Sequence, residues 1–141
     1  MAKAKIVNDG EGRFYGIKIL CRGCAYMGGK PMGHLMPVHW LPDGATESPY
    51  NAGKPHWSFN GDFDKPVFGP SLNTWWGGDK YKREDGTEYE SVPLHRCHSF
   101  IGCNGAQPGQ MIYLGDCTHA LAGQVVDLPD MTEEADCEEI D

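Results

Sequence analysis

Long apolar runs are missing from this sequence, and their absence limits what the protein can be. No stretch of 18 apolar residues occurs among its 141 residues, so no membrane-spanning helix is expected. Residues 1–5 are polar and basic, and no apolar stretch follows them, which predicts that there is no signal peptide. Internal repeats and heptads are also missing, which argues against a repeat array or a coiled coil.

Basic side chains are absent from the C-terminal end. Residues 130–141 contain seven acidic side chains and no Lys or Arg, whereas residues 1–129 contain 13 acidic and 12 basic ones. The formal net charge of -8 is therefore concentrated in this acidic C-terminal tail. Such a tail is typical of a solvated end or of a docking segment for a basic partner. Neither the charge nor its distribution favours contact with the phosphates of nucleic acid.

Glycine and proline are abundant, with 19 and 10 residues, and they favour turns and short strands over long helices. The length suits one domain, predicted over residues 1–129. We expect a mainly β fold with long loops, a small β-rich α+β fold being the alternative. Alternating patterns predict strands at residues 5–7, 14–20, 34–41, 66–72, 97–102, 110–114 and 124–128. Residues 42–55 form a long polar connection, and residues 79–91 form a charged, turn-rich insert.

The spacing of Cys21 and Cys24 is the first chemical signal. Six cysteines without a signal peptide indicate a reducing compartment, where thiols serve as metal ligands more often than as disulfides. Two residues between thiols let both sulfurs face one cation, as in a zinc knuckle. A redox motif has the same spacing, but it needs a helix after the second cysteine, and the Gly-rich residues 25–33 predict a loop.

The remaining ligands of one predicted zinc ion come from three other places. His34 lies ten residues after Cys24, and Cys97 and His98 lie on a strand of the predicted hairpin at residues 97–114. Neighbouring strand residues point to opposite faces, so only one of Cys97 and His98 would reach a given metal easily. Cys117 and His119 follow the hairpin and share a face in extended chain. The candidate ligands are Cys21, Cys24, His34, Cys97, His98 and His119, and Cys117 is a further candidate. His39, His56 and His95 are interpreted as surface or packing residues.

Two kinds of metal site remain open at this stage. Four protein ligands would make a closed, structural zinc site, whereas three would leave room for a catalytic water. No His-Glu-x-x-His motif is present, and the closed site is the leading interpretation. Ser71 and Ser99 are the candidate nucleophiles. Ser99 adjoins His98 but faces away from it on a strand, and no Gly-x-Ser-x-Gly motif occurs, so the sequence argues against serine catalysis.

Several motifs together resemble a small family of phage and prophage proteins of unknown function. They are Cys21-x-x-Cys24, His34-x-x-Pro37, Trp57-x-Phe59-Asn60-Gly61-Asp62, Pro70-Ser71, Cys97-His98-Ser99-Phe100-Ile101 and Thr118-His119-Ala120-Leu121-Ala122-Gly123-Gln124. Members of this family often carry the label ammonia monooxygenase. A membrane enzyme of that kind needs membrane-spanning helices and copper or iron ligands, neither of which this sequence offers. The resemblance implies a phage origin and a zinc-type site, and it supplies no activity.

The sequence therefore predicts a small, phage-encoded, zinc-stabilised binding or structural protein. It would act on a host factor or in virion assembly, in the host cytoplasm or incorporated in the virion, through a protein partner. The aromatic side chains and the acidic tail would supply the contacts. A zinc-dependent hydrolase with an open site built from the same ligands is the alternative.

Overall fold

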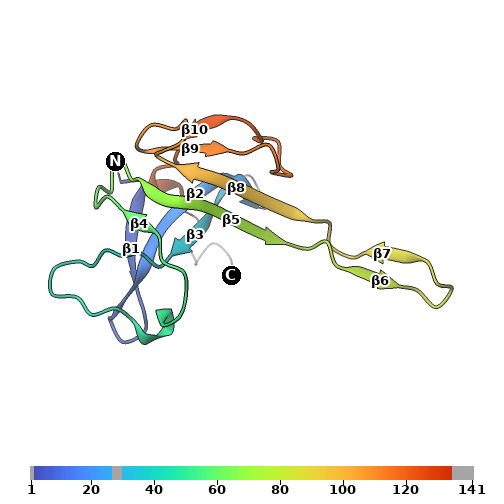
Figure 1. Ribbon diagram of the computed structural model, residues 1–141, viewed down its shortest axis with the longest axis horizontal. Helices are drawn as coiled ribbons and strands as arrows, with labels where there is room; N and C mark the ends of the chain where they lie inside the picture. Colours follow the sequence, from blue (N-terminus) through green and yellow to red (C-terminus); the bar gives the residue numbers. More distant parts are fainter. Residues whose placement is uncertain (1, 27–29, 135–141) are drawn as a thin grey trace.

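Two antiparallel sheets and a small hairpin make up the computed structural model, which describes residues 2–26 and 30–134 (Figure 1). The first sheet, β1-β2-β3, contains β1 (Ala4–Asn8), β2 (Phe14–Tyr26) and β3 (Lys30–Met36). The second sheet, in the order β10-β9-β8-β5-β4, contains β4 (Ser58–Phe59), β5 (Phe68–Trp76), β8 (His95–Ile101), β9 (Gln110–Tyr113) and β10 (Val125–Asp127). The hairpin pairs β6 (Lys80–Lys82) with β7 (Glu88–Glu90). The described residues include two 3-10 helices, η1 (Pro49–Asn51) and η2 (Met131–Glu133), and no α-helix, so the protein is mainly β, as predicted.

The core combines the inward faces of the two larger sheets. Ile17 and Ile19 of β2 are fully buried, as is Met111 of β9 in the other sheet, and all three belong to one apolar cluster. Their spacing follows the two-residue period of a strand, which directs alternate side chains to one face. Alternation along each strand therefore places these side chains on the face that packs between the two sheets.

Strand β8 lies in the interior of the second sheet, between β5 and β9. Its odd-numbered residues Cys97, Ser99 and Ile101 are buried, and His98 and Phe100 between them lie partly exposed on the other face. The antiparallel pair of Ser99 with Tyr113 establishes the predicted hairpin of β8 and β9. Strand β8 therefore directs one set of side chains between the two sheets and the other set to an accessible surface.

The boundaries of the first sheet differ from the prediction. The loop expected at residues 25–33 is partly strand, because β2 continues to Tyr26 and β3 starts at Lys30; residues 27–29 lie outside the described part. Cys21 and Cys24 therefore lie within β2, where its register with β3 is irregular, rather than after the end of the strand. Strand β3 ends at Met36, since Pro37 has no N–H to donate to a ladder.

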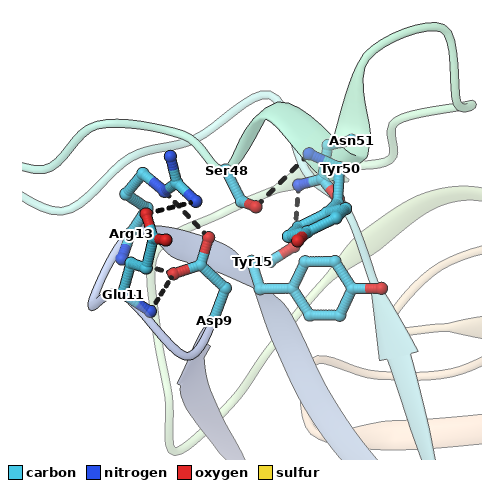
Figure 2. A network of polar contacts seen from close by, with 7 residues as sticks. All are labelled: Asp9, Glu11, Arg13, Tyr15, Ser48, Tyr50 and Asn51. Carbon is cyan, nitrogen blue, oxygen red and sulfur yellow. Dashed lines mark hydrogen bonds and ion pairs between the residues drawn. The ribbon is translucent and has the colours of Figure 1, made fainter.

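The long connection at residues 42–55 is fastened to the first sheet. Phe14 donates its N–H to the carbonyl of Thr46, and the N–H of Ser48 donates to the carbonyl of Phe14, both at 2.8 Å. Asn51, which is 1% exposed, donates its side-chain amide to the carbonyl of Tyr15 at 2.8 Å (Figure 2). Hydrogen bonds of this kind give the connection a defined path although it contains almost no regular structure.

Strands β6 and β7 project from the body as an arm, formed by the predicted charged insert (Figure 1). All six of their residues are exposed, and Lys80 pairs with Glu90 at 2.8 Å. Large apolar side chains are exposed along the arm and at its base: Trp75, Trp76, Tyr81, Tyr89, Val92 and Leu94.

The beginning of the predicted acidic tail is paired with the first sheet. Glu134 forms ion pairs with Lys5 at 2.7 Å and Lys18 at 3.1 Å, and Glu133 forms one with Arg22 at 2.9 Å. Residues 135–141, which include most of the predicted tail and Cys137, lie outside the described residues. Among the described residues, no helix has the length and apolar character needed to cross a membrane.

Candidate metal centre

Three thiols and one imidazole meet between the two sheets. The ligand atoms of Cys21, Cys24, His34 and Cys97 all lie within 4.8 Å of one another, and all four residues are buried. Cys21 and Cys24 come from β2, His34 from β3 and Cys97 from β8. A buried group of four such ligands has the composition and the spacing of a metal-binding site.

Strand geometry explains how these residues meet. His34 pairs with Ile19 across the β2–β3 ladder, so it shares the inward face of Ile19 and of Cys21 two residues further along β2. The irregular stretch after Cys21 lets Cys24 contribute to the same cluster. Cys97 approaches from the opposite sheet through the buried face of β8. The cluster therefore joins the two layers of the fold.

The imidazole of His34 supports a metal ligand role. His34 is 8% exposed, and its Nε2 has no hydrogen-bond partner within the described part of the chain. Buried polar atoms are nearly always hydrogen-bonded, so an unpartnered nitrogen beside three thiols requires an explanation. Coordination of a cation through its lone pair is one that fits the chemistry of the surrounding sulfurs.

The distance between sulfur atoms also fits a cation in tetrahedral coordination. The Sγ atoms of Cys21 and Cys97 are 3.8 Å apart. Zinc–sulfur bonds of roughly 2.3 Å in tetrahedral geometry place neighbouring sulfurs roughly 3.8 Å from each other. The two sheets are thus already at the separation that such an ion requires.

The three thiols share hydrogen bonds that shift their pKa values in opposite directions. Hydrogen bonds from Cys24 and Cys97 hold the pKa of the Cys21 thiol far below its ordinary value. The same hydrogen bonds, in which Cys24 and Cys97 are donors, raise the pKa of Cys24 to about 12 and also raise the pKa of Cys97. A bound divalent cation would stabilise all three thiolates together, which makes metal binding and thiol ionisation a single event.

Each of the three sulfurs also has a hydrogen-bonding neighbour with an aromatic ring. The hydroxyl of Tyr113 lies 3.2 Å from the Sγ of Cys21, and it accepts the N–H of Gly23 at 3.0 Å, so its own proton is directed to the sulfur. Burial is the main cause that raises the pKa of Tyr113, which keeps this donor protonated. The Nε2 of His95 lies 3.2 Å from the Sγ of Cys24, and its ring stacks on Trp76.

His119 belongs to this surrounding layer rather than to the four clustered ligands. Its Nε2 lies 3.3 Å from the Sγ of Cys97, and its Nδ1 accepts the N–H of Leu121 at 3.2 Å. Burial lowers the pKa of His119, which favours the neutral ring. A neutral imidazole that accepts at Nδ1 carries its proton on Nε2, and it therefore donates to the sulfur. Gly23 is needed here, because a Cβ at that position would meet the imidazole ring of His119.

Cys117 forms a second group with Cys97 and His119, yet its thiol is engaged elsewhere. Its Sγ donates to the carbonyl of His98 and accepts the N–H of His98, both at 3.2 Å. A thiol that donates its proton to a carbonyl is not a thiolate ligand in this arrangement. Cys117 thus fastens the segment after β9 to β8, which brings His119 to the cluster.

Two sequence interpretations are changed by these positions. His98 does not reach the cluster, because it alternates with Cys97 on β8 and its ring lies on the opposite face. His95, interpreted from the sequence as a surface or packing residue, lies against Cys24. The signal for His95 was present, since it precedes Cys97 by two residues and so shares its face. His39 and His56 lie away from the cluster and stack on each other at 5.1 Å.

Comparison of the chain with protein-family models, with curated proteins and with solved structures gave no match.

Proposed function

We propose that the cluster holds one zinc ion and that this ion has a structural function. The observation that carries the proposal is the buried group of Cys21, Cys24, His34 and Cys97, which unites residues of both sheets. Zinc prefers this combination of thiolate and imidazole ligands in a tetrahedral site. A small, Gly-rich chain gains from such an ion because its apolar core alone is modest.

The composition of the cluster favours a closed site over the alternative of a zinc-dependent hydrolase. Three thiolates and an imidazole complete a tetrahedral shell and leave no position for a catalytic water. The surrounding donors Tyr113, His95 and His119 each lie against a sulfur. Hydrogen bonds to coordinated thiolates stabilise their charge and orient them, as expected for a structural metal site whose ligands remain coordinated.

The protein built around this ion would act as a binding or structural protein with a protein partner. The exposed apolar side chains at the arm, such as Trp75 at 60% and Tyr81 at 46% exposure, support a contact surface. The resemblance of the sequence motifs to phage and prophage proteins supports a host factor or a virion component as that partner. A place in the host cytoplasm or in the virion is part of this proposal.

Metal analysis of the purified protein tests the zinc proposal directly. We expect one zinc per chain by elemental mass spectrometry, and an X-ray absorption spectrum that fits three sulfur ligands and one nitrogen ligand. The variant Cys103→Ser is the control and should keep its zinc, because Cys103 is a half-buried free thiol outside the cluster. A chain purified under reducing conditions without chelator that contained no metal would contradict the proposal, and a ligand set with an oxygen would favour the hydrolase.

A further inference from the structure

The accessible face of β8 carries a second constellation of polar side chains. The Nε2 of His98 lies 3.0 Å from the Oγ of Ser71, and the Nδ1 of His98 lies 3.2 Å from the Oδ2 of Asp116. The three residues come from β5, from β8 and from the segment after β9. One imidazole is thus held between a hydroxyl and a carboxylate, each on a different ring nitrogen.

The register of the second sheet produces this arrangement. Asn73 of β5 pairs directly with His98 of β8. The register is irregular between Phe68 and Leu72, but Leu72 is buried and the Oγ of Ser71 lies beside His98, so Ser71 shares the accessible face of Asn73. Asp116 reaches the other side of the ring because the chain after β9 continues along β8, where Leu114 donates its N–H to the carbonyl of His98. The side chains of His98 and Asp116 remain 25% and 47% exposed, so a substrate can reach them.

We propose that Ser71, His98 and Asp116 form a nucleophilic catalytic site that acts on the carbonyl of an ester or an amide. An imidazole hydrogen-bonded to a serine can remove its proton as the oxygen attacks, and a carboxylate on the other nitrogen fixes the tautomer and orients the ring. Ser71 and His98 are the catalytic residues, and Asp116 is a positioning residue. This inference goes beyond the structural zinc site.

The reaction is balanced without any further co-reactant. The Oγ of Ser71 bonds to the carbonyl carbon while its proton passes to Nε2 of His98. The bond from that carbon to the leaving oxygen or nitrogen then breaks, and His98 gives its proton to the leaving group. Water adds to the acyl-serine, giving a proton to His98, and the carbon–Oγ bond breaks as this proton returns to Ser71. The products are a carboxylic acid and an alcohol or amine.

The open edge of β5 beyond Ser71 indicates how a substrate chain would lie. In the described part of the sheet, β4 pairs only with Phe68 and Gly69 of β5, and the carbonyl of Ser71 accepts the indole N–H of Trp57 at 3.2 Å. The stretch of β5 from Leu72 onward, within the described part, therefore lacks a strand partner on that side. An extended chain can add to such an edge through main-chain hydrogen bonds. Asn73 is exposed on the same face as Ser71, so its side-chain amide is the candidate donor to the oxyanion that forms during attack.

The zinc cluster and this site occupy opposite faces of one strand. Cys97 enters the cluster from the buried face, and His98 points to the accessible face. A zinc ion that fixes the position of β8 therefore also fixes the backbone that carries His98. Loss of the catalytic site should leave the zinc content unchanged, which separates a failure of this inference from a failure of the zinc proposal.

Labelling with a fluorophosphonate tests the nucleophile, because this probe forms a covalent adduct with an activated serine. We expect the zinc-loaded full chain to gain one adduct by intact mass spectrometry, with peptide mapping to Ser71. Ser71→Ala should abolish labelling, whereas Ser91→Ala, at an exposed position near the arm, should not change it. His98→Gln should slow labelling by on the order of 10²-fold or more.

The role of Asp116 is separated from mere packing by the kinetics of labelling. Asp116→Asn should lower the maximal labelling rate with little effect on the half-saturating probe concentration, and Asp116→Glu should restore part of the rate. Hydrolysis of p-nitrophenyl butyrate and cleavage of a mixed peptide library then distinguish ester from peptide substrates, either of which supports the inference. Zinc content and melting temperature confirm that each variant is folded. A folded wild-type chain that is not labelled, or is labelled equally after Ser71→Ala, would overturn it.

Discussion

Replacement of Cys97 by serine gives the most informative test of the metal centre. Of the four clustered ligands, Cys97 alone belongs to the five-stranded sheet, whereas the other three lie on β2 and β3. Cys97→Ser should therefore leave a partial chelate on one sheet and break the link to the other. The loss should appear both in zinc affinity and in the free energy of unfolding.

The size of this effect follows from the ligand count. Structural zinc contributes roughly 10–16 kcal/mol of binding free energy in small domains, so one ligand of four accounts for roughly 3 kcal/mol. For a chain of this length, about 1 kcal/mol shifts the melting temperature by about 3 °C, so a decrease of about 10 °C is expected. The decrease should nearly vanish when wild type and variant are compared after zinc removal.

Differential scanning calorimetry with and without chelator measures the melting temperatures of the zinc-free and zinc-bound protein. Competition with a chromophoric chelator measures zinc affinity. Cys117→Ser is the informative control, because the thiol of Cys117 bonds to the backbone of His98 and zinc should remain bound. If Cys97→Ser retained one zinc per chain and melted within about 2 °C of wild type, the assignment of Cys97 as a ligand would be refuted.

Three further predictions concern the surroundings of the site and the long connection. His119→Ala should retain one zinc per chain but weaken zinc affinity by about 10- to 100-fold, the usual effect of losing a partner of a metal ligand; loss of all zinc would instead make His119 a ligand. Asn51→Ala should lower the free energy of unfolding in urea by about 1–3 kcal/mol, because the carbonyl of Tyr15 loses a buried donor. An unchanged free energy of unfolding would contradict this role of Asn51. The hydrogen bond that His56 donates to the carboxylate of Glu47 raises the pKa of His56, so this pair stabilises the fold fully below the ordinary histidine pKa and loses its effect as pH rises through the raised value. The melting temperature of wild type should accordingly fall relative to that of His56→Gln as pH is raised from 6 upward, and parallel pH profiles would refute it.

The sequence predicted part of the metal centre because some ligand geometry is local. Two thiols three positions apart can face one cation wherever the chain places them, so Cys21 and Cys24 were identified without knowledge of the fold. Strand alternation reduced Cys97 and His98 to one ligand, but it did not reveal which of the two faces would be buried. The structure brings Cys97 to the cluster, since its face of β8 packs toward the first sheet.

The sequence alone determined the class of fold and the residues available for chemistry. Gly and Pro at frequent intervals and two-residue alternation predict short strands with one buried face, because these effects act within a few neighbouring residues. Tertiary structure decided which distant residues meet. Ser71, His98 and Asp116 are separated by 27 and 18 positions, and only the register of β5 with β8 and the path of the chain after β9 place them within hydrogen-bond distance. Register and layer packing depend on the summed burial of both sheets, which no local pattern of residues encodes.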